Sequence, residues 1–187
     1  IFDLGGVIVN IDYNLTINAF RKIGVKNPEQ LYSQVQQTKL FDQFEMGKIT
    51  PREFRQKLKI LLPGETSYFE IDEAWRAMIL DFPPERLLLL KKLKKKYRLF
   101  LLSNTNKIHM SAASKILKDK NQWNLWNSVF EKKYYSYQVG MRKPDQEIFE
   151  YVLKDKNLIA GETLFIDDSE QNIAGAQKTA KIRSPGP

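Results

Sequence analysis

The chain of 187 residues contains no cysteine and a single histidine. Disulfide bridges and thiolate metal sites are therefore excluded, and the composition suits a reducing compartment, so we expect a cytoplasmic protein. Long apolar runs are also lacking: the longest candidate, residues 87–90, continues directly into lysines. A helix that crosses a bilayer needs about 20 apolar residues. We therefore expect no membrane partner.

Acidic residues are fewer than basic ones, 22 against 30, which gives a formal net charge of +8. Part of this excess lies at the C-terminal end of a predicted helix, where the helix dipole favours cations: Lys91, Lys92 and residues 94–96. No motif that reads a nucleic-acid groove accompanies these lysines, so we expect no nucleic-acid partner. An anionic small molecule suits the same sign of charge. The sequence leaves open whether the protein is a monomer or a homodimer.

Short apolar runs that stop at a polar residue alternate with helical patterns along most of the chain. The predicted strands cover residues 1–9, 97–103, 163–167 and, with a weaker pattern, 128–134. The predicted helices cover residues 84–96, 107–118, 145–155 and 170–180. This alternation predicts an α/β fold with a doubly wound parallel sheet. Ligands of such sheets bind beyond the carboxyl ends of the strands.

Residues 13–82 interrupt the alternation, because their patterns are helical only. The predicted helices cover residues 15–23, 28–36, 51–62 and 69–80. Asn27-Pro28 and Thr50-Pro51 are typical helix starts, with a capping residue followed by a proline in the first turn. We therefore predict an all-α helical bundle at residues 13–82, inserted into an α/β core made of residues 1–12 and 83–187.

Polar side chains follow the predicted strands and should meet in one crevice: Asp3, Ser103, Asn104, Lys143, Asp167 and Asp168. Clustered carboxylates repel one another and need a cation at neutral pH. Hard oxygen ligands without histidine or cysteine point to Mg²⁺, which keeps several waters and pairs with phosphate. The sequence therefore predicts a magnesium site that receives a small phosphorylated metabolite.

The same residues suggest how a phosphate ester could be cleaved. With the metal and Lys143 present, a phosphate dianion can approach Asp3, whose carboxylate can attack phosphorus and form an aspartyl-phosphate. Ser103 and the amides near Asn104 would hold the non-bridging oxygens and stabilise the charge of the transferring group. Catalysis is therefore expected to depend on Asp3, Ser103 and Lys143, and substrate binding on Ser103, Asn104 and Lys143.

The chain resembles the haloacid dehalogenase (HAD) superfamily of phosphatases over nearly its whole length. The four segments that carry the resemblance are Asp3-Leu4-Gly5-Gly6-Val7-Ile8, Leu101-Leu102-Ser103-Asn104, the set Ser136, Gly140, Lys143 and Pro144, and Asp167-Asp168-Ser169. The resemblance implies a Rossmann-like core, with Asp3 as nucleophile. It also implies a magnesium site formed by Asp3, the carbonyl of Gly5 and Asp168, assisted by Asp167. Residues 13–82 are similar to the family's helical cap, which covers the site and selects the substrate.

Gly5 departs from the family pattern. The family normally has a second aspartate there, a general acid and base of a kind often worth about 10²–10⁴-fold in rate. A bacterial branch of the family carries a similar opening with glycine and includes an α-D-glucose 1-phosphate phosphatase, so the resemblance implies a sugar phosphate such as glucose 1-phosphate as substrate. Asp12 or a cap residue could replace the missing proton donor.

Two other functions remain open. A metal-independent haloacid dehalogenase also lacks the second aspartate, although such enzymes do not keep an acidic pair like Asp167-Asp168. A catalytically silent module that binds a phosphorylated metabolite is supported by Gly5 alone.

Several other residues carry weaker expectations. We interpret His109 as a non-catalytic residue at the surface or facing the cap. The tryptophans are expected to pack in the core or at an interface: Trp75, Trp123 and Trp126. One cap segment could face the substrate, through Phe41, Phe44, Glu45 and Gly47.

Overall fold

A computed structural model describes residues 1–31, 39–62 and 64–182. Its centre is a parallel sheet in which β1 (Phe100–Ser103) pairs with β2 (Lys132–Tyr135), with Phe100 opposite Lys132 and Ser103 opposite Tyr135. The sheet continues on the other side of β1, because Phe2 forms parallel bridges to both Leu101 and Ile166. The spatial order is therefore residues 164–166, residues 1–3, β1 and β2, with every pair parallel.

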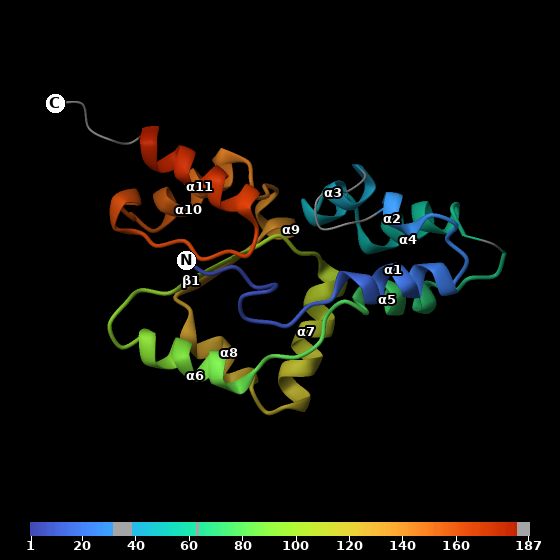
Figure 1. The fold of residues 1–187 in the computed structure, drawn as a ribbon, viewed down its shortest axis with the longest axis horizontal. Coiled ribbons are helices and arrows are strands. Elements are labelled where there is room, and N and C mark those ends of the chain that lie inside the picture. Colours follow the sequence, from blue (N-terminus) through green and yellow to red (C-terminus); the bar gives the residue numbers. More distant parts are fainter. Residues whose placement is uncertain (32–38, 63, 183–187) are drawn as a thin grey trace.

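Both faces of this sheet are covered by helices, as expected for buried parallel strands. Every residue of β1 is buried, and its side chains alternate between two apolar clusters. One face packs against α6 (Pro84–Leu93), α7 (Lys107–Asp119) and α8 (Trp123–Val129). The other packs against α10 (Gln146–Asp155) and α11 (Glu170–Ile182), as Figure 1 shows. Two short elements complete the core: α9 (Ser136–Val139) follows β2, and the 3₁₀ turn η1 (Ala160–Glu162) connects α10 to the strand residues before α11.

A second helical layer lies beside the core, at the right of Figure 1. It consists of α1 (Tyr13–Lys22), α2 (Pro28–Leu31), α3 (Lys39–Glu45), α4 (Pro51–Lys59) and α5 (Tyr68–Arg76). Its own apolar core is aromatic: Phe41 packs against Phe20, Phe54 and Trp75. The α/β core with an all-α cap is thus confirmed. We propose that the cap comprises residues 13–82.

The start signals of the cap helices have the expected structure. Thr50 accepts a hydrogen bond from the main-chain N–H of Glu53, whose carboxylate accepts one from the N–H of Thr50. Ser67 and Glu70 form the same reciprocal cap on α5. Of the predicted helix 28–36, α2 covers the beginning, and residues 32–38 lie outside the described part of the chain.

The strand predictions were wrong in their bounds: β1 begins at Phe100 and not at residue 97, and within 163–167 only Ile166 forms a bridge. Residues 1–9 do not form one strand: extended pairing stops near Asp3, and the N–H groups of Ile8 and Val9 both donate to the carbonyl of Leu4 in a tight turn. The fourth strand begins at Lys132, because residues 128 and 129 still belong to α8. The helices α3, α8 and α9 were not predicted; each has at most seven residues, too few for a clear amphipathic period.

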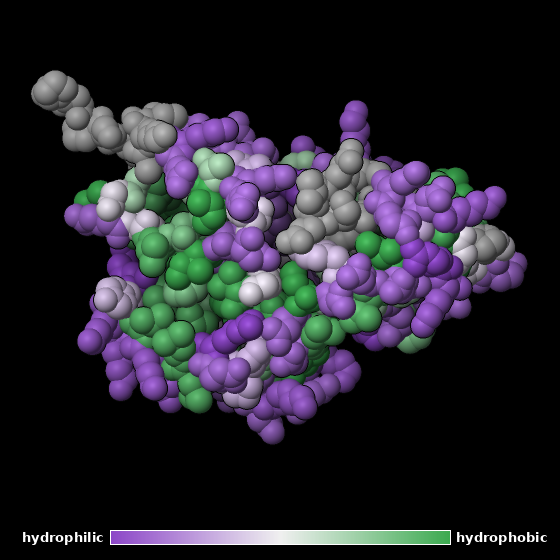
Figure 2. Space-filling model, viewed as in Figure 1, coloured by the Kyte–Doolittle hydropathy of each residue, from purple (hydrophilic) through white to green (hydrophobic). Residues whose placement is uncertain are grey.

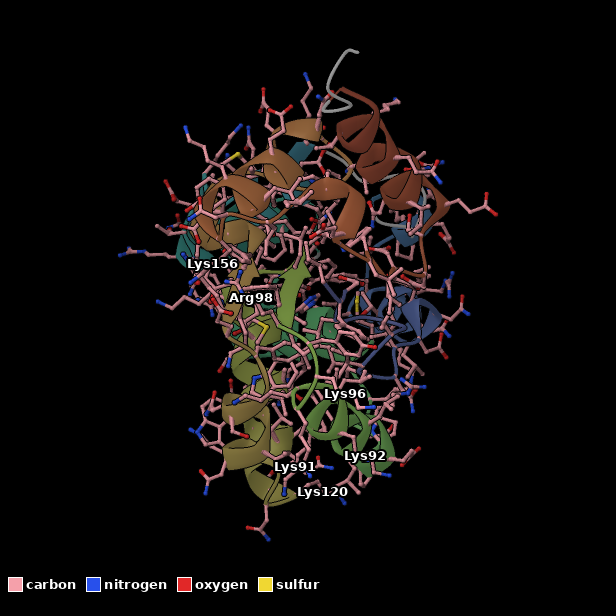
Figure 3. All side chains as sticks on the ribbon, turned by 90° about the vertical axis from the view of Figure 1, so that its left-hand side faces the viewer. Lys91, Lys92, Lys96, Arg98, Lys120 and Lys156 are labelled. Atoms are coloured by element: carbon pink, nitrogen blue, oxygen red, sulfur yellow. The ribbon has the colours of Figure 1, made fainter. Side chains whose placement is uncertain are left out.

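Basic residues lie on the side of the core away from the cap (Figure 3). Figure 3 views the molecule from the side opposite the cap and labels six of these cations: Lys91, Lys92, Lys96, Arg98, Lys120 and Lys156. Arg98 and Lys156 are partly neutralised there by Glu131, at 2.7 and 3.5 Å. Figure 2 shows apolar side chains over the core at the left and a largely hydrophilic cap at the right. Within the described residues, no helix is long and apolar enough to cross a membrane.

Candidate active site

The turn after Asp3 brings the chain against the strand that ends at Asp167-Asp168. Gly6 has a positive φ of 68°, which favours glycine, and a Cβ atom there would lie only 2.3 Å from Oδ2 of Asp168. Any side chain at position 6 would therefore displace the carboxylate of Asp168. This close approach explains why the apolar opening of the sequence is broken by glycine.

Three carboxylates meet at this point. Asp3, Asp167 and Asp168 each offer an oxygen, and these oxygens lie within 4.8 Å of one another. Burial raises the pKa of Asp3 to about 6, although the neighbouring charge of Lys143 opposes the shift. Burial, followed by the charge of Asp167, also raises the pKa of Asp168. The protein thus holds carboxylates where ionisation is unfavourable, and this donor set of hard oxygens fits a divalent cation such as Mg²⁺.

Lys143 supplies the positive charge that the protein itself contributes to the cluster. The side chain is 1% exposed, and Nζ donates a hydrogen bond to Oδ1 of Asp3 at 2.6 Å and another to Oδ2 of Asp167. Asn104 fixes the main chain of Lys143 from both sides, donating to its carbonyl at 2.8 Å and accepting from its N–H at 2.9 Å. Both polar atoms of the Asn104 side chain are therefore engaged within the protein, and the hydroxyl of Ser103 donates to the carbonyl of Asn104 at 3.5 Å.

Asp167 and Asp168 have different surroundings. Asp167 is fully enclosed: besides Lys143, it accepts hydrogen bonds from the N–H of Ser169 and from Nδ2 of Asn172, both at 2.9 Å. Asp168 lies on the wall of the adjoining cavity. The environment therefore suits Asp167 to positioning Lys143 and Asp168 to contacting a ligand.

The loop after β1 is fixed by a residue whose role the sequence did not indicate. The hydroxyl of Ser136 accepts a hydrogen bond from the N–H of Thr105 and donates one to its carbonyl, both at 2.9 Å. This pair ties the loop that follows Ser103 to the first residue of α9. Ser103 itself is buried at the end of β1 and borders the cavity.

A cavity of about 380 Å³ lies between this cluster and the cap. Six of the seven predicted site residues line it: Asp3, Gly5, Ser103, Asn104, Lys143 and Asp168. The cap and its connections contribute Tyr13, Asp42, Glu45, Met78 and Ile79. The core adds further polar residues: Thr105, His109, Arg142, Ser169, Gln171 and Asn172. Sequence reasoning assigned no role to Tyr13, Asp42 or Arg142, because their approach to the site depends on how the cap is placed.

Gly5 borders the cavity, and the space beside it is filled. A Cβ atom at position 5 would lie 3.0 Å from Cδ1 of Ile11, tighter than ordinary van der Waals contact. The carboxylate of Asp12, one candidate to replace the missing acid, caps α1 by accepting from the N–H of Asn14 at 2.9 Å. The described lining of the cavity includes Tyr13 but not Asp12.

His109 faces the cap and is not at the surface. Its Nε2 lies 2.9 Å from the carbonyl of Trp75, and its ring stacks on that indole with centroids 4.4 Å apart. Burial lowers the pKa of His109 to about 4. Trp75 and Trp126 are buried in the two cores and Trp123 packs against the larger one, as predicted.

The four residues of the cap segment that we expected near the substrate have different surroundings. Phe41 and Phe44 are buried in the cap core, so the expectation was wrong for them. Glu45 lines the cavity. Gly47 has a φ of 66° and packs so closely on the core that a Cβ would lie 2.2 Å from the carbonyl oxygen of Tyr137.

Comparison with known proteins places this arrangement among related enzymes. Residues 1–178 match the family model for haloacid dehalogenase-like hydrolases. The chain is 37% identical over 173 residues to a D-ribitol-5-phosphate phosphatase of Bacteroides thetaiotaomicron, covering 92% of this chain and 84% of that protein. A sesquiterpene phosphatase of Aspergillus oryzae is 29% identical over 97% of this chain and 86% of its own length.

A solved structure agrees with the same assignment. A HAD family enzyme from Bacteroides thetaiotaomicron, in complex with magnesium and inorganic phosphate, is 40% identical with a TM-score of 0.83. The alignment covers 96% of this chain and 88% of that one. The chain belongs to the haloacid dehalogenase-like hydrolase family, and its similarity to curated phosphatases over most of its length assigns it to the phosphatases of that family.

Proposed function

We propose that this protein is a Mg²⁺-dependent phosphatase that hydrolyses a small phosphorylated polyol or sugar through an aspartyl-phosphate on Asp3. The observation that carries the proposal is the cluster in which the buried Lys143 bridges Asp3 and Asp167 beside Asp168, at the core end of the cavity. The magnesium and phosphate bound by the related HAD enzyme support it. A cytoplasmic location, suggested by the absence of cysteine, belongs to the same proposal.

The metal would be held by Asp3, Asp168 and the carbonyl of Gly5, with Asp167 keeping Lys143 in place. The donor set fits, because the three carboxylates are close together and Gly6 leaves room for Asp168. Bound Mg²⁺ supplies positive charge that offsets the negative charge of the phosphate and the carboxylates. Lys143 contributes in the same sense, since its ammonium already contacts Asp3.

The chemical steps follow from these positions. A carboxylate oxygen of Asp3 attacks phosphorus, the bond from phosphorus to the ester oxygen breaks, and that oxygen leaves with a proton taken from the site. Water then attacks the aspartyl-phosphate, which releases inorganic phosphate and restores the carboxylate. The hydroxyl of Ser103 and the main-chain amides after it would hold the non-bridging oxygens during both steps. No side chain at position 5 takes part, so the proton donor belongs to another group at the cavity.

The substrate class rests on the relatives. One acts on D-ribitol 5-phosphate, as its name states, and none of the proteins compared above is named for glucose 1-phosphate. We therefore propose a phosphorylated polyol or open-chain sugar in preference to glucose 1-phosphate. The acidic cluster favours a phosphatase over a metal-independent dehalogenase, which has no cation to hold there.

The test is phosphate release from a panel that contains D-ribitol 5-phosphate, glucose 1-phosphate and p-nitrophenyl phosphate, with Mg²⁺ and with EDTA. We expect turnover with Mg²⁺ only, and loss of at least about 10³-fold in Asp3→Asn, because the nucleophile is removed. Asp119→Asn, at an exposed ion pair on α7, is the matched control and should retain full activity. Failure to release phosphate from every ester would reject the proposal, and chloride release from a haloacid in EDTA would favour the dehalogenase.

A further inference from the structure

One wall of the cavity is built from charged side chains of both layers. Arg142, in the loop that leads to Lys143, donates from Nη1 to Oδ1 of Asp42, and its Nη2 lies 3.4 Å from Oε2 of Glu45. Asp42 and Glu45 lie on α3 of the cap, one turn apart. All three side chains line the cavity, and we refer to them as the charged wall.

The charged wall is held in place by more than its ion pairs. Two residues after α3, Gly47 packs against the main chain of α9 so closely that any Cβ would clash with the carbonyl of Tyr137. Glu45 is nearly enclosed, with 4% of its side chain exposed, whereas Asp42 is 31% exposed and can reach a ligand. The main-chain contact therefore fixes where the two carboxylates stand relative to the core.

The charges on the wall do not balance. Two carboxylates face one guanidinium, which leaves one net negative charge at the end of the cavity formed by the cap. The acidic cluster lies in the same cavity, at the end formed by the core. The other cation of the described lining, Lys143, pairs with Asp3 and Asp167 at the core end. Burial lowers the pKa of His109, which also lines the cavity, to about 4, so its imidazole is neutral at pH 7.

We propose that Asp42, Glu45 and Arg142 select the leaving group by charge. A neutral polyol can donate hydroxyl hydrogen bonds to the carboxylates, and an ammonium group is attracted by them. A second anionic group on the substrate is repelled by the net negative wall. The inference rests on the proposed phosphatase function and specifies which phosphate esters the cavity accepts. A wall that only fastened the cap to the core would not discriminate among leaving groups of equal size.

The test uses three esters of matched length: D-ribitol 5-phosphate, D-ribonate 5-phosphate and 1-amino-1-deoxy-D-ribitol 5-phosphate. They carry a hydroxyl, a carboxylate and an ammonium at the carbon farthest from the phosphate. We expect kcat/KM for the ribonate to be lower than for the ribitol ester by about tenfold, as for one unit charge some 10 Å away at an effective dielectric constant of about 20. The amino ester should be hydrolysed at least as well as the ribitol ester.

Asp42→Asn and Glu45→Gln remove one charge each while keeping the shape of the side chain. Each should bring the ribitol-to-ribonate ratio of kcat/KM close to one. The matched control is Asp72→Asn, which removes a cap carboxylate that pairs with Arg55 at 2.7 Å outside the cavity. Its ratio should equal that of the parent protein. Since both substrates are measured on the same sample, partial loss of folded protein cancels from each ratio.

The outcomes separate the two proposals. A parent protein that hydrolyses p-nitrophenyl phosphate but treats the ribitol and ribonate esters alike would overturn the charge-selection inference alone. The inference would also be overturned if the ribitol-to-ribonate ratio of kcat/KM stayed at the parent value in both Asp42→Asn and Glu45→Gln. The charged wall would then only hold the cap against the core. Absence of phosphate release from every ester, p-nitrophenyl phosphate included, would reject the phosphatase function itself.

Discussion

Replacing Lys143 with methionine tests how strongly the carboxylates depend on their shared ammonium. The substitution keeps the length of the side chain but leaves Asp3 and Asp167, with side chains 11% and 0% exposed, beside each other without a countercharge. Removing one partner of a buried ion pair typically costs about 3–5 kcal/mol. For a chain of 187 residues, 4 kcal/mol lowers the melting temperature by about 10 °C.

The loss should also depend on pH. The pKa of Asp3 is raised to about 6 even with Lys143 present, and without Lys143 it should rise further. A folded state that binds more protons than the unfolded state loses stability as pH rises, so the deficit should grow from pH 6 to pH 8. Differential scanning fluorimetry in EDTA at several pH values measures it.

Lys115→Met is the matched control for this experiment. Lys115 pairs with Asp119 one helical turn away, with both side chains more than half exposed, and such pairs contribute only about 0.3–0.5 kcal/mol. Its melting temperature should fall by about 1 °C at every pH. If Lys143→Met melted within 2 °C of this control at pH 8, about a fifth of the shift expected for a buried pair, the account of the cluster would be refuted.

Further predictions concern glycines 5 and 6 and His109. Gly5→Asp should lower activity and melting temperature, because its Cβ meets Ile11, and Ile11→Ala in the same chain should recover part of the stability loss. Gly6→Ala should cost about 1–2 kcal/mol from the positive φ alone, and it should weaken Mg²⁺ binding, measured by calorimetry, by displacing Asp168. The pKa of His109 is lowered to about 4 in the folded protein, so the free energy of unfolding should fall by about 3 kcal/mol as pH falls from 6.5 to 4. In urea unfolding, His109→Gln should not show this loss of stability at low pH. NMR of the single imidazole in the parent protein should show a pKa below 5.

The core of the candidate site could be predicted because its residues lie at points fixed by local sequence. Asp3, Ser103 and Asp168 each follow an apolar run, and parallel strands bring such positions to one edge of the sheet. The bounds of the first strand could not be predicted in the same way. Residues 7–9 are as apolar as a strand, but Gly6 turns them back against Leu4.

The cap side of the cavity could not be predicted, because its contacts join residues far apart in sequence. Asp42 and Arg142 are 100 residues apart, and neither lies in a pattern that indicates its partner. The helix α3 that carries Asp42 and Glu45 has only seven residues and follows a stretch outside the described part of the chain. Charge selection by the wall therefore depends on tertiary structure alone.

Gly5 also lies against the junction between core and cap. Ile11, the residue that bridges to Ile79 at the base of the cap, occupies the space beside Gly5. A side chain at position 5 would require the Cδ1 methyl of Ile11 to shift slightly, and Ile11 and Ile79 both pack against the main core cluster. The junction between core and cap and the choice of residue at position 5 are thus coupled. The proton donor should be sought among the other groups that line the cavity, such as Tyr13 of the cap.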